Sequence, residues 1–136
     1  MKVKVGVIGT GAIGIEHINR INHKTQGAFV TAVSEIYVEA ASKSAEEIGA
    51  QFFKTGEELI ATEEVEVVVV TSWDPTHEKY VLEAIKHGKY VFCEKPLAMD
   101  AAGCRRIVDA EVAYGKKLVQ VGFMRRYDRG YIELKE

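Results

Sequence analysis

The sequence predicts an α/β fold in which helices cover both faces of one doubly wound parallel sheet, giving three layers. Short β-branched runs alternate with helical patterns along the chain. Such alternation implies parallel strands joined by right-handed crossovers. One run, at residues 67–70, consists of valine alone. A run of this kind is expected for a central strand that is buried on both faces.

The expected strands are the apolar runs, and the expected helices lie between them, where apolar residues recur three or four positions apart. The strands are residues 3–8, 29–33, 67–71, 90–93 and 118–121, with a further short strand at 51–53. Helical spacing is found in three sets, namely Val38, Ala41, Ala45 and Ile48, then Val81, Leu82 and Ile85, and then Cys104, Ile107 and Val108.

Glycines and capping residues mark the ends of these helices. Gly49, Gly88 and Gly115 each follow a helical stretch, where a left-handed residue ends a helix before the next strand. Thr55-Gly56-Glu57-Glu58 has the form of a capping box. Asp74-Pro75 predicts an N-cap followed by proline at the first helical position.

Composition indicates one globular domain and excludes several classes of protein. Apolar residues make up 47% of the 136 residues and charged residues 28%, as in ordinary soluble domains. The net charge is -2 with both signs scattered, which argues against a nucleic-acid-binding surface. The longest apolar run is far below the roughly 18 residues of a membrane-spanning helix, so we expect no membrane segment.

The cysteines and histidines indicate neither a disulfide scaffold nor a metal site. The chain has two cysteines without CxxC spacing, and a reducing cytoplasm is the location that we expect. His17, His23 and His87 form no metal-binding pattern with either cysteine, and the sequence assigns them no role.

A complete GxGxxG motif, Gly9-Thr10-Gly11-Ala12-Ile13-Gly14, follows the first expected strand and opens the first expected helix. In a dinucleotide-binding Rossmann turn, Gly9 permits the tight turn, Gly11 leaves the backbone open to a pyrophosphate, and Gly14 lets the helix pack against the strand. Backbone N–H groups of Gly11, Ala12 and Ile13 would bind the phosphates. Taken alone the motif is weak, because glycines also cluster in ordinary turns.

Glu35 supplies the context that the glycine motif needs. It ends the second expected strand, 21 residues after Gly14, where a carboxylate accepts hydrogen bonds from the adenosine ribose. Such a carboxylate repels a 2′-phosphate, and Ile36 and Tyr37 follow it instead of an arginine. The sequence therefore predicts NAD in preference to NADP. A strand-end glutamate without this spacing is more often simply solvated.

Glu94, Lys95 and Pro96 lie at the carboxyl end of another expected strand, the edge at which open parallel sheets bind ligands. A lysine there can hydrogen-bond a substrate hydroxyl and, when partly desolvated, take part in moving its proton. The alternative is an exposed strand-end lysine without a catalytic role.

Three segments together resemble the glucose-fructose oxidoreductase, inositol dehydrogenase and rhizopine catabolism family, over essentially the whole chain. They are the glycine turn in VIGTGAIG, the stretch VTSWDPTHEKYVLEAIKHGKYVFCEKPLA from Val70 to Ala98, and LVQVGFMRRYD from Leu118 to Asp128. The resemblance implies oxidation of a secondary hydroxyl of an inositol, or of a related sugar, with hydride passing to NAD.

The resemblance also implies roles for individual residues. Lys95 matches the catalytic lysine of the family and would also bind substrate. The residues that would border the cofactor are Ser72, Trp73, His77 and Glu94, and those that would border the substrate are Met124 and Arg125.

Read without the family, several of these residues have an ordinary structural interpretation. His77 would more often be a helix-terminal hydrogen-bonding residue, and Trp73 a packing residue. Arg125 and its neighbour Arg126 would be solvated or ion-paired with Asp128 or Glu133, so that only one of them would face substrate.

Relative to the family, residues 1–122 correspond to the dinucleotide-binding domain. Residues 123–136 correspond to the start of the connection to a C-terminal substrate domain, and 128–136 has a helical pattern. In the family that second domain supplies an aspartate and the histidine expected to act as general base. We therefore expect this chain to bind NAD but to turn over inositol negligibly, and the full-length form to be a homo-oligomer.

One further departure from the family concerns Glu35, and two alternatives to the function that the resemblance implies stay open. The family more often has aspartate in place of Glu35, although the longer side chain still reaches a ribose. One alternative is a regulatory module that binds NAD without chemistry, against which Glu94-Lys95-Pro96 argues. The other is a dehydrogenase of the same family that acts on a different sugar.

Overall fold

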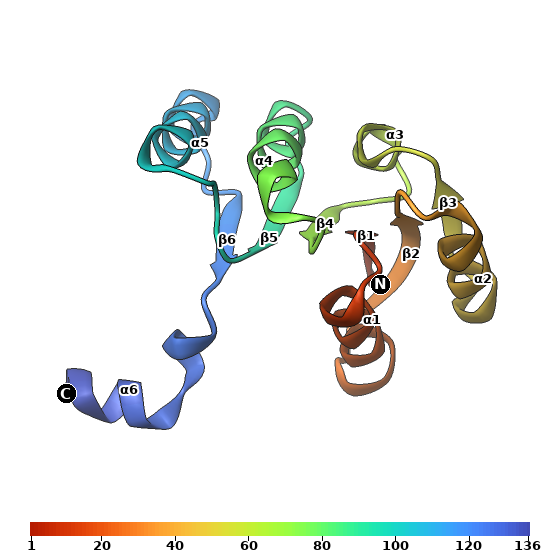
Figure 1. Ribbon diagram of the computed structural model, residues 1–136, viewed down its shortest axis with the longest axis horizontal. Helices are drawn as coiled ribbons and strands as arrows, with labels where there is room; N and C mark the ends of the chain where they lie inside the picture. Colours follow the sequence, from red (N-terminus) through yellow and green to blue (C-terminus); the bar gives the residue numbers. More distant parts are fainter.

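The computed structural model describes all 136 residues and confirms the predicted three-layer α/β fold (Figure 1). Six strands, all parallel, form one sheet in the order β3-β2-β1-β4-β5-β6. The strands are β1 Val3–Ile8, β2 Ala28–Ser34, β3 Gln51–Phe53, β4 Val67–Val70, β5 Tyr90–Glu94 and β6 Val119–Gly122. Every expected strand is present, with its ends within a residue of the expected positions.

Helices cover both faces of the sheet. They are α1 Ala12–Lys24, α2 Val38–Ile48, α3 Gly56–Ala61, α4 His77–Lys86, α5 Ala101–Tyr114 and α6 Arg129–Lys135. Helices α1 and α2 pack against one face, and α3, α4 and α5 pack against the other (Figure 1). None of the helices combines the length and the hydropathy needed to cross a membrane.

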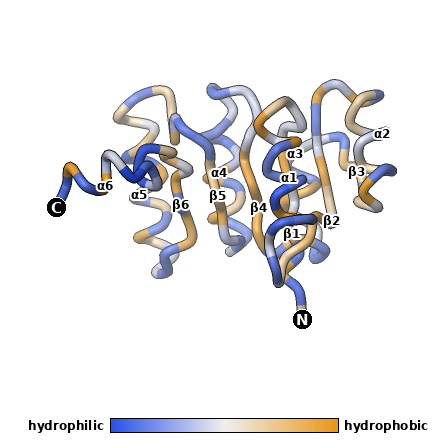
Figure 2. The backbone as a smooth tube through the Cα atoms, turned by 90° about the horizontal axis from the view of Figure 1, so that it is seen from below, coloured by the Kyte–Doolittle hydropathy of each residue, from blue (hydrophilic) through white to orange (hydrophobic).

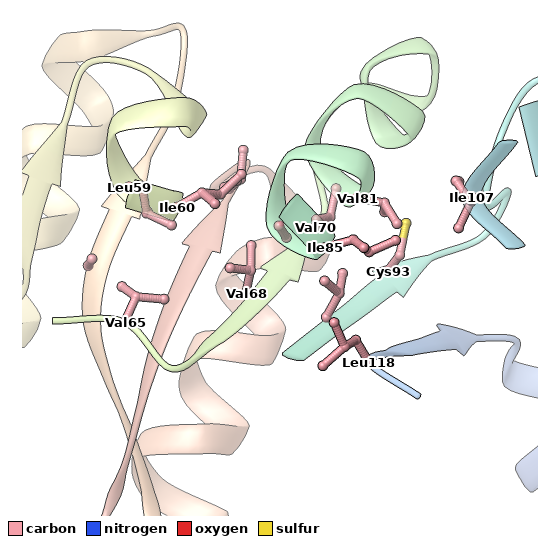
Figure 3. Close-up of a cluster of buried hydrophobic side chains, with 14 of the residues drawn as sticks. Leu59, Ile60, Val65, Val68, Val70, Val81, Ile85, Cys93, Ile107 and Leu118 are labelled. Atoms are coloured by element: carbon pink, nitrogen blue, oxygen red, sulfur yellow. The ribbon is translucent and has the colours of Figure 1, made fainter. Parts of the chain in front are cut away.

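Each face of the sheet has its own hydrophobic core. The larger cluster lies under α3, α4 and α5 and includes Leu59, Ile60, Val81, Ile85 and Ile107 (Figure 3). The smaller cluster lies under α1 and α2 and consists of Val5, Val7, Ile18, Val30, Val33, Ala45 and Val69.

Strand β4 contributes to both cores. Val68 and Val70 belong to the larger cluster and Val69 to the smaller one, because successive side chains of a strand point to opposite faces. Figure 2 shows β4 in the hydrophobic colour at the centre of the sheet. The prediction of a central strand buried on both faces is confirmed.

The predicted helix ends are confirmed except at Asp74. Gly49 and Gly115 end their helices in the left-handed conformation, and Gly88 adopts it two residues beyond the end of α4, after the C-cap His87. The capping box at Thr55 is present. Asp74, however, caps no helix with its side chain.

The chain from Asp74 to Thr76 forms a 3₁₀ helix instead, and α4 begins only at His77. The backbone N–H of Thr76 donates to the carbonyl of Trp73 at 2.8 Å. This bond closes a tight turn over Pro75 and delays the start of the α-helix.

The last residues project from the edge of the sheet beyond β6 (Figure 1). They form a 3₁₀ helix at Met124–Tyr127 and then α6, and neither buries a residue. The expected helix in 128–136 is present, and Asp128 caps it by accepting from the N–H of Gly130 at 3.0 Å.

Candidate functional site

A cleft of about 800 Å³ opens at the carboxyl ends of β1, β2 and β4. The strand order reverses between β1 and β4, and open parallel sheets bind ligands at such a switch point. Its principal lining residues are Gly9 and Gly11 from the glycine turn, Glu35, Ile36 and Tyr37 after β2, Lys54, Thr55, Gly56 and Glu57 after β3, Ser72 and Trp73 after β4, and Lys79 and Tyr80 in α4.

The three glycines of the turn have three different surroundings. Gly9 has φ 93°, and a Cβ there would lie 2.5 Å from the backbone nitrogen of Ser72. A Cβ on Gly14 would overlap the carbonyl oxygen of Gly9. A Cβ on Gly11 would meet no atom of the protein within 4 Å. Gly9 and Gly14 are therefore required by the protein's own packing, whereas Gly11 faces open space.

Helix α1 begins at Ala12, directly beside that open space. Gly11 is its N-cap and provides no side-chain acceptor. The first N–H groups of a helix have no partner within the helix, and together with the helix dipole they attract an anion. Ala12 and Ile13 are both exposed, so this end of the helix is accessible to a phosphate group.

Glu35 ties the end of β2 to the glycine turn. One carboxylate oxygen, Oε2, accepts from the N–H of Thr10 at 2.8 Å, and the other accepts from the N–H of Ile36 at 2.8 Å. The N–H of Gly9 also donates to the carbonyl of Ser34 at 2.8 Å. Because each carboxylate oxygen has two lone pairs, Glu35 can still accept hydrogen bonds from hydroxyls in the cleft.

Thr71 holds the same turn from the side of β4. Its hydroxyl donates to the carbonyl of Gly9, with Oγ1 and the carbonyl oxygen 2.7 Å apart. Its N–H donates to the carbonyl of Ile8 at 2.9 Å. The sequence interpretation did not identify Thr71 as part of the site, and its position at the end of a central strand was the only available signal.

Ser72 and Trp73 both lie on the wall of the cleft. The Ser72 hydroxyl is 2.7 Å from the hydroxyl of Thr76. The Trp73 side chain is 75% exposed, so it does not act as a core packing residue. Its indole is available to a ligand.

His77 lies behind the cleft instead of lining it. The residue is only 1% exposed. Its Nδ1 is 2.6 Å from the carbonyl oxygen of Pro96, and its Nε2 is 2.9 Å from that of Ser72. These contacts are those of a hydrogen-bonding residue at a helix start, and the place of His77 beside the cofactor stays a prediction. The ring joins the loop after β4 to the Glu94-Lys95-Pro96 segment.

Glu94 is held by helix α1. Its Oε1 is 2.9 Å from Nε2 of His17, and the His17 ring packs edge-on against Phe92. The N–H of Lys95 donates to the other carboxylate oxygen at 3.3 Å. The Lys95 side chain is exposed and free to meet a ligand. His17, which the sequence assigned no role, lies one helical turn after Gly14 and thereby reaches β5.

Met124 and Arg125 lie on the projecting C-terminal segment, away from the cleft (Figure 1). Both are exposed. The guanidinium of Arg125 is 3.1 Å from a carboxylate oxygen of Asp128 and lies over the ring of Tyr131. These contacts are the ion pairing expected of Arg125 when it is read without the family. That Met124 and Arg125 border the substrate stays a prediction.

The cysteines and acidic residues do not form a further reactive centre. No group of three His, Cys, Asp or Glu side chains is arranged to hold a metal ion. Burial raises the pKa of the Cys93 thiol to about 12. Because a thiolate and not a thiol is the nucleophile, Cys93 acts as a core residue.

We predict opposite consequences for two neighbouring glycines. Gly14→Ala should lower the free energy of unfolding by about 2 kcal/mol or more, because the added methyl group overlaps the Gly9 carbonyl. Gly11→Ala should cost less than about 1 kcal/mol, yet weaken dinucleotide binding. Urea denaturation and ligand titration of both variants check this. Equal losses of stability would contradict the role given to Gly14.

His77→Ala should lower the free energy of unfolding by about 2 kcal/mol or more, because it opens a cavity at a buried ring and removes the ring's hydrogen bond to a neighbouring backbone carbonyl. The matched control is His87→Ala at the exposed end of the same helix, for which we expect a change within about 0.5 kcal/mol. Thermal and urea denaturation measure both. A stability of the His77 variant equal to that of the control would exclude the bridging role.

Comparison with known proteins identifies the family and its relatives. The sequence model of an oxidoreductase family with an NAD-binding Rossmann fold matches residues 3–123. The inositol 2-dehydrogenase of Agrobacterium fabrum strain C58 is 59% identical over 138 aligned positions, covering 100% of this chain and 41% of that protein. The inositol 2-dehydrogenase of Azotobacter vinelandii is 57% identical and is covered to 40%.

Solved structures that resemble this chain also include inositol dehydrogenases. The myo-inositol dehydrogenase from Lactobacillus casei, in complex with NAD(H) and myo-inositol, superposes with a TM-score of 0.93 at 44% identity, over 99% of this chain and 40% of that one. The scyllo-inositol dehydrogenase from the same organism, with NAD(H) and scyllo-inositol, gives 0.91 at 26% identity. The chain thus spans about 40% of the length of the relatives that it matches. By its sequence and by the fold described above, it belongs to the oxidoreductase family with an NAD-binding Rossmann fold.

Proposed function

We propose that this chain forms the NAD-binding half of a dehydrogenase that oxidises a secondary hydroxyl of myo-inositol, or of a closely related polyol, with hydride transfer to NAD. The observation that supports it most is the cleft at the switch point of the sheet, which the glycine turn and Glu35 line together. The identity of 59% to an inositol 2-dehydrogenase supports the substrate class.

The residues of the cleft fit a dinucleotide. The open space at Gly11 accommodates a pyrophosphate against the first N–H groups of α1. Glu35 accepts hydrogen bonds from the adenosine ribose hydroxyls, in place of solvent. The exposed indole of Trp73, with Ser72 beside it, borders the nicotinamide end. Bound NAD supplies the hydride acceptor.

Lys95 is the residue that we assign to the substrate side of the reaction. Its exposed ammonium group donates a hydrogen bond to the reacting hydroxyl and stabilises negative charge on that oxygen. The hydroxyl proton meanwhile passes to the general base, which the family resemblance assigns to a histidine of the second domain. Glu94, held by His17, and His77, bonded to the Pro96 carbonyl, fix the backbone on either side of Lys95. Met124 and Arg125 would border the substrate from the projecting segment.

A related polyol is the second candidate substrate. The scyllo-inositol dehydrogenase matches almost the whole chain with a TM-score of 0.91, so the same half-domain architecture serves enzymes for different inositol isomers. The higher identity to the myo-inositol dehydrogenase, 44% against 26%, favours myo-inositol.

Calorimetric titration with NAD and NADP tests the cofactor assignment. The unchanged chain should bind NAD saturably and NADP much more weakly. Glu35→Gln should weaken NAD binding about tenfold or more, because hydrogen bonds to a charged carboxylate contribute roughly 1.5–3 kcal/mol. The matched control is Glu39→Gln, an exposed acid in the first turn of α2. NAD affinity that is the same in both variants would refute the role of Glu35.

A further inference from the structure

Besides Glu35, the cleft contains a pair of opposite charges. Glu57, in the first turn of α3, and Lys79, in α4, both line it. The Lys79 ammonium group forms an ion pair with Oε1 of Glu57. The sequence separates these residues by a helix, a strand and two loops, so their pairing is a product of the fold. Lys54 lines the same wall without an ion pair.

The packing between α3 and α4 fixes this pair in place. Gly56 lies so close to Tyr80 that a Cβ there would overlap the tyrosine ring. The Lys79 ammonium is 5.2 Å from the centre of that ring, a distance at which a cation and an aromatic face attract each other. Lys79 is therefore held at the cleft wall by two partners, Glu57 and Tyr80.

Both members of the pair are charged at neutral pH. The hydrogen bond from Lys79 lowers the pKa of the Glu57 carboxyl, and the same bond raises the pKa of the Lys79 ammonium. The pair contributes no net charge to the cleft, and the other two charges of the lining are Glu35 and the unpaired Lys54. Lys79 is thus a cation in the cleft whose charge Glu57 neutralises.

We propose, resting on the NAD site proposed above, that Glu57 is a second determinant of cofactor selectivity, acting with Glu35. By neutralising Lys79, Glu57 withholds a cation that would otherwise add to Lys54 in attracting the 2′-phosphate of NADP. That phosphate carries about two negative charges at neutral pH, so a freed lysine in the same cleft favours NADP over NAD. The discrimination of this chain against NADP then has two parts. Glu35 repels the 2′-phosphate, and Glu57 neutralises Lys79.

The test measures the ratio of the NADP and NAD dissociation constants by calorimetry. It compares the unchanged chain with Glu57→Gln, with Glu57→Gln/Lys79→Gln, and with Asp109→Asn as a control. Asp109 pairs with Arg105 on the exposed face of α5, outside the cleft. Glu57→Gln should lower the ratio about threefold to tenfold at low salt. The gain should shrink at high ionic strength, disappear in the double variant, and be absent in the control.

The outcomes separate this inference from the proposed function. Saturable NAD binding by the unchanged chain with an unaltered ratio in Glu57→Gln would overturn the inference alone. A gain that persists in the double variant would also overturn it, because Lys79 would then not be the cation involved. Absence of NAD binding by the unchanged chain would overturn the proposed function and the inference with it.

Discussion

Helix α1 begins so close to the end of β1 that no side chain fits between Gly14 and the carbonyl of Gly9, and the cleft depends on this close approach. The same carbonyl accepts the Thr71 hydroxyl, while the N–H of Gly9 donates to β2. The ends of β1, β2 and β4 therefore converge on one turn. Their convergence directs the N-terminus of α1 at the cleft, where a phosphate group gains most from the helix dipole.

Glu35 links this architecture to cofactor choice. Its carboxylate accepts the N–H groups of Thr10 and Ile36 and at the same time faces the cleft. One side chain thus sets the shape of the turn and the charge that an adenosine ribose would meet. In the same cleft, Glu57 neutralises the charge of Lys79.

Much of the fold could be predicted because its signals are local. Five of the strands follow from runs that contain β-branched residues and β3 from the short apolar pair Phe52-Phe53, while the glycine turn and Glu35 follow from spacing within one β-α-β unit. Residues that meet across the fold gave no such signal. His77 Nδ1 meets the Pro96 carbonyl, 19 residues later in the sequence, and Glu94 meets His17 across a separation of 77 residues. The error at Asp74 was local, because Pro75 fits a 3₁₀ turn as readily as the first turn of an α-helix.

A crystal structure of this chain grown with NAD tests the assignment of the cleft most directly. We expect the pyrophosphate to lie against the backbone N–H groups of residues 11–13, and the adenosine ribose hydroxyls to lie within hydrogen-bond distance of the Glu35 carboxylate. NAD bound away from the glycine turn, or bound there with its ribose turned from Glu35, would contradict the roles given to Gly11 and Glu35.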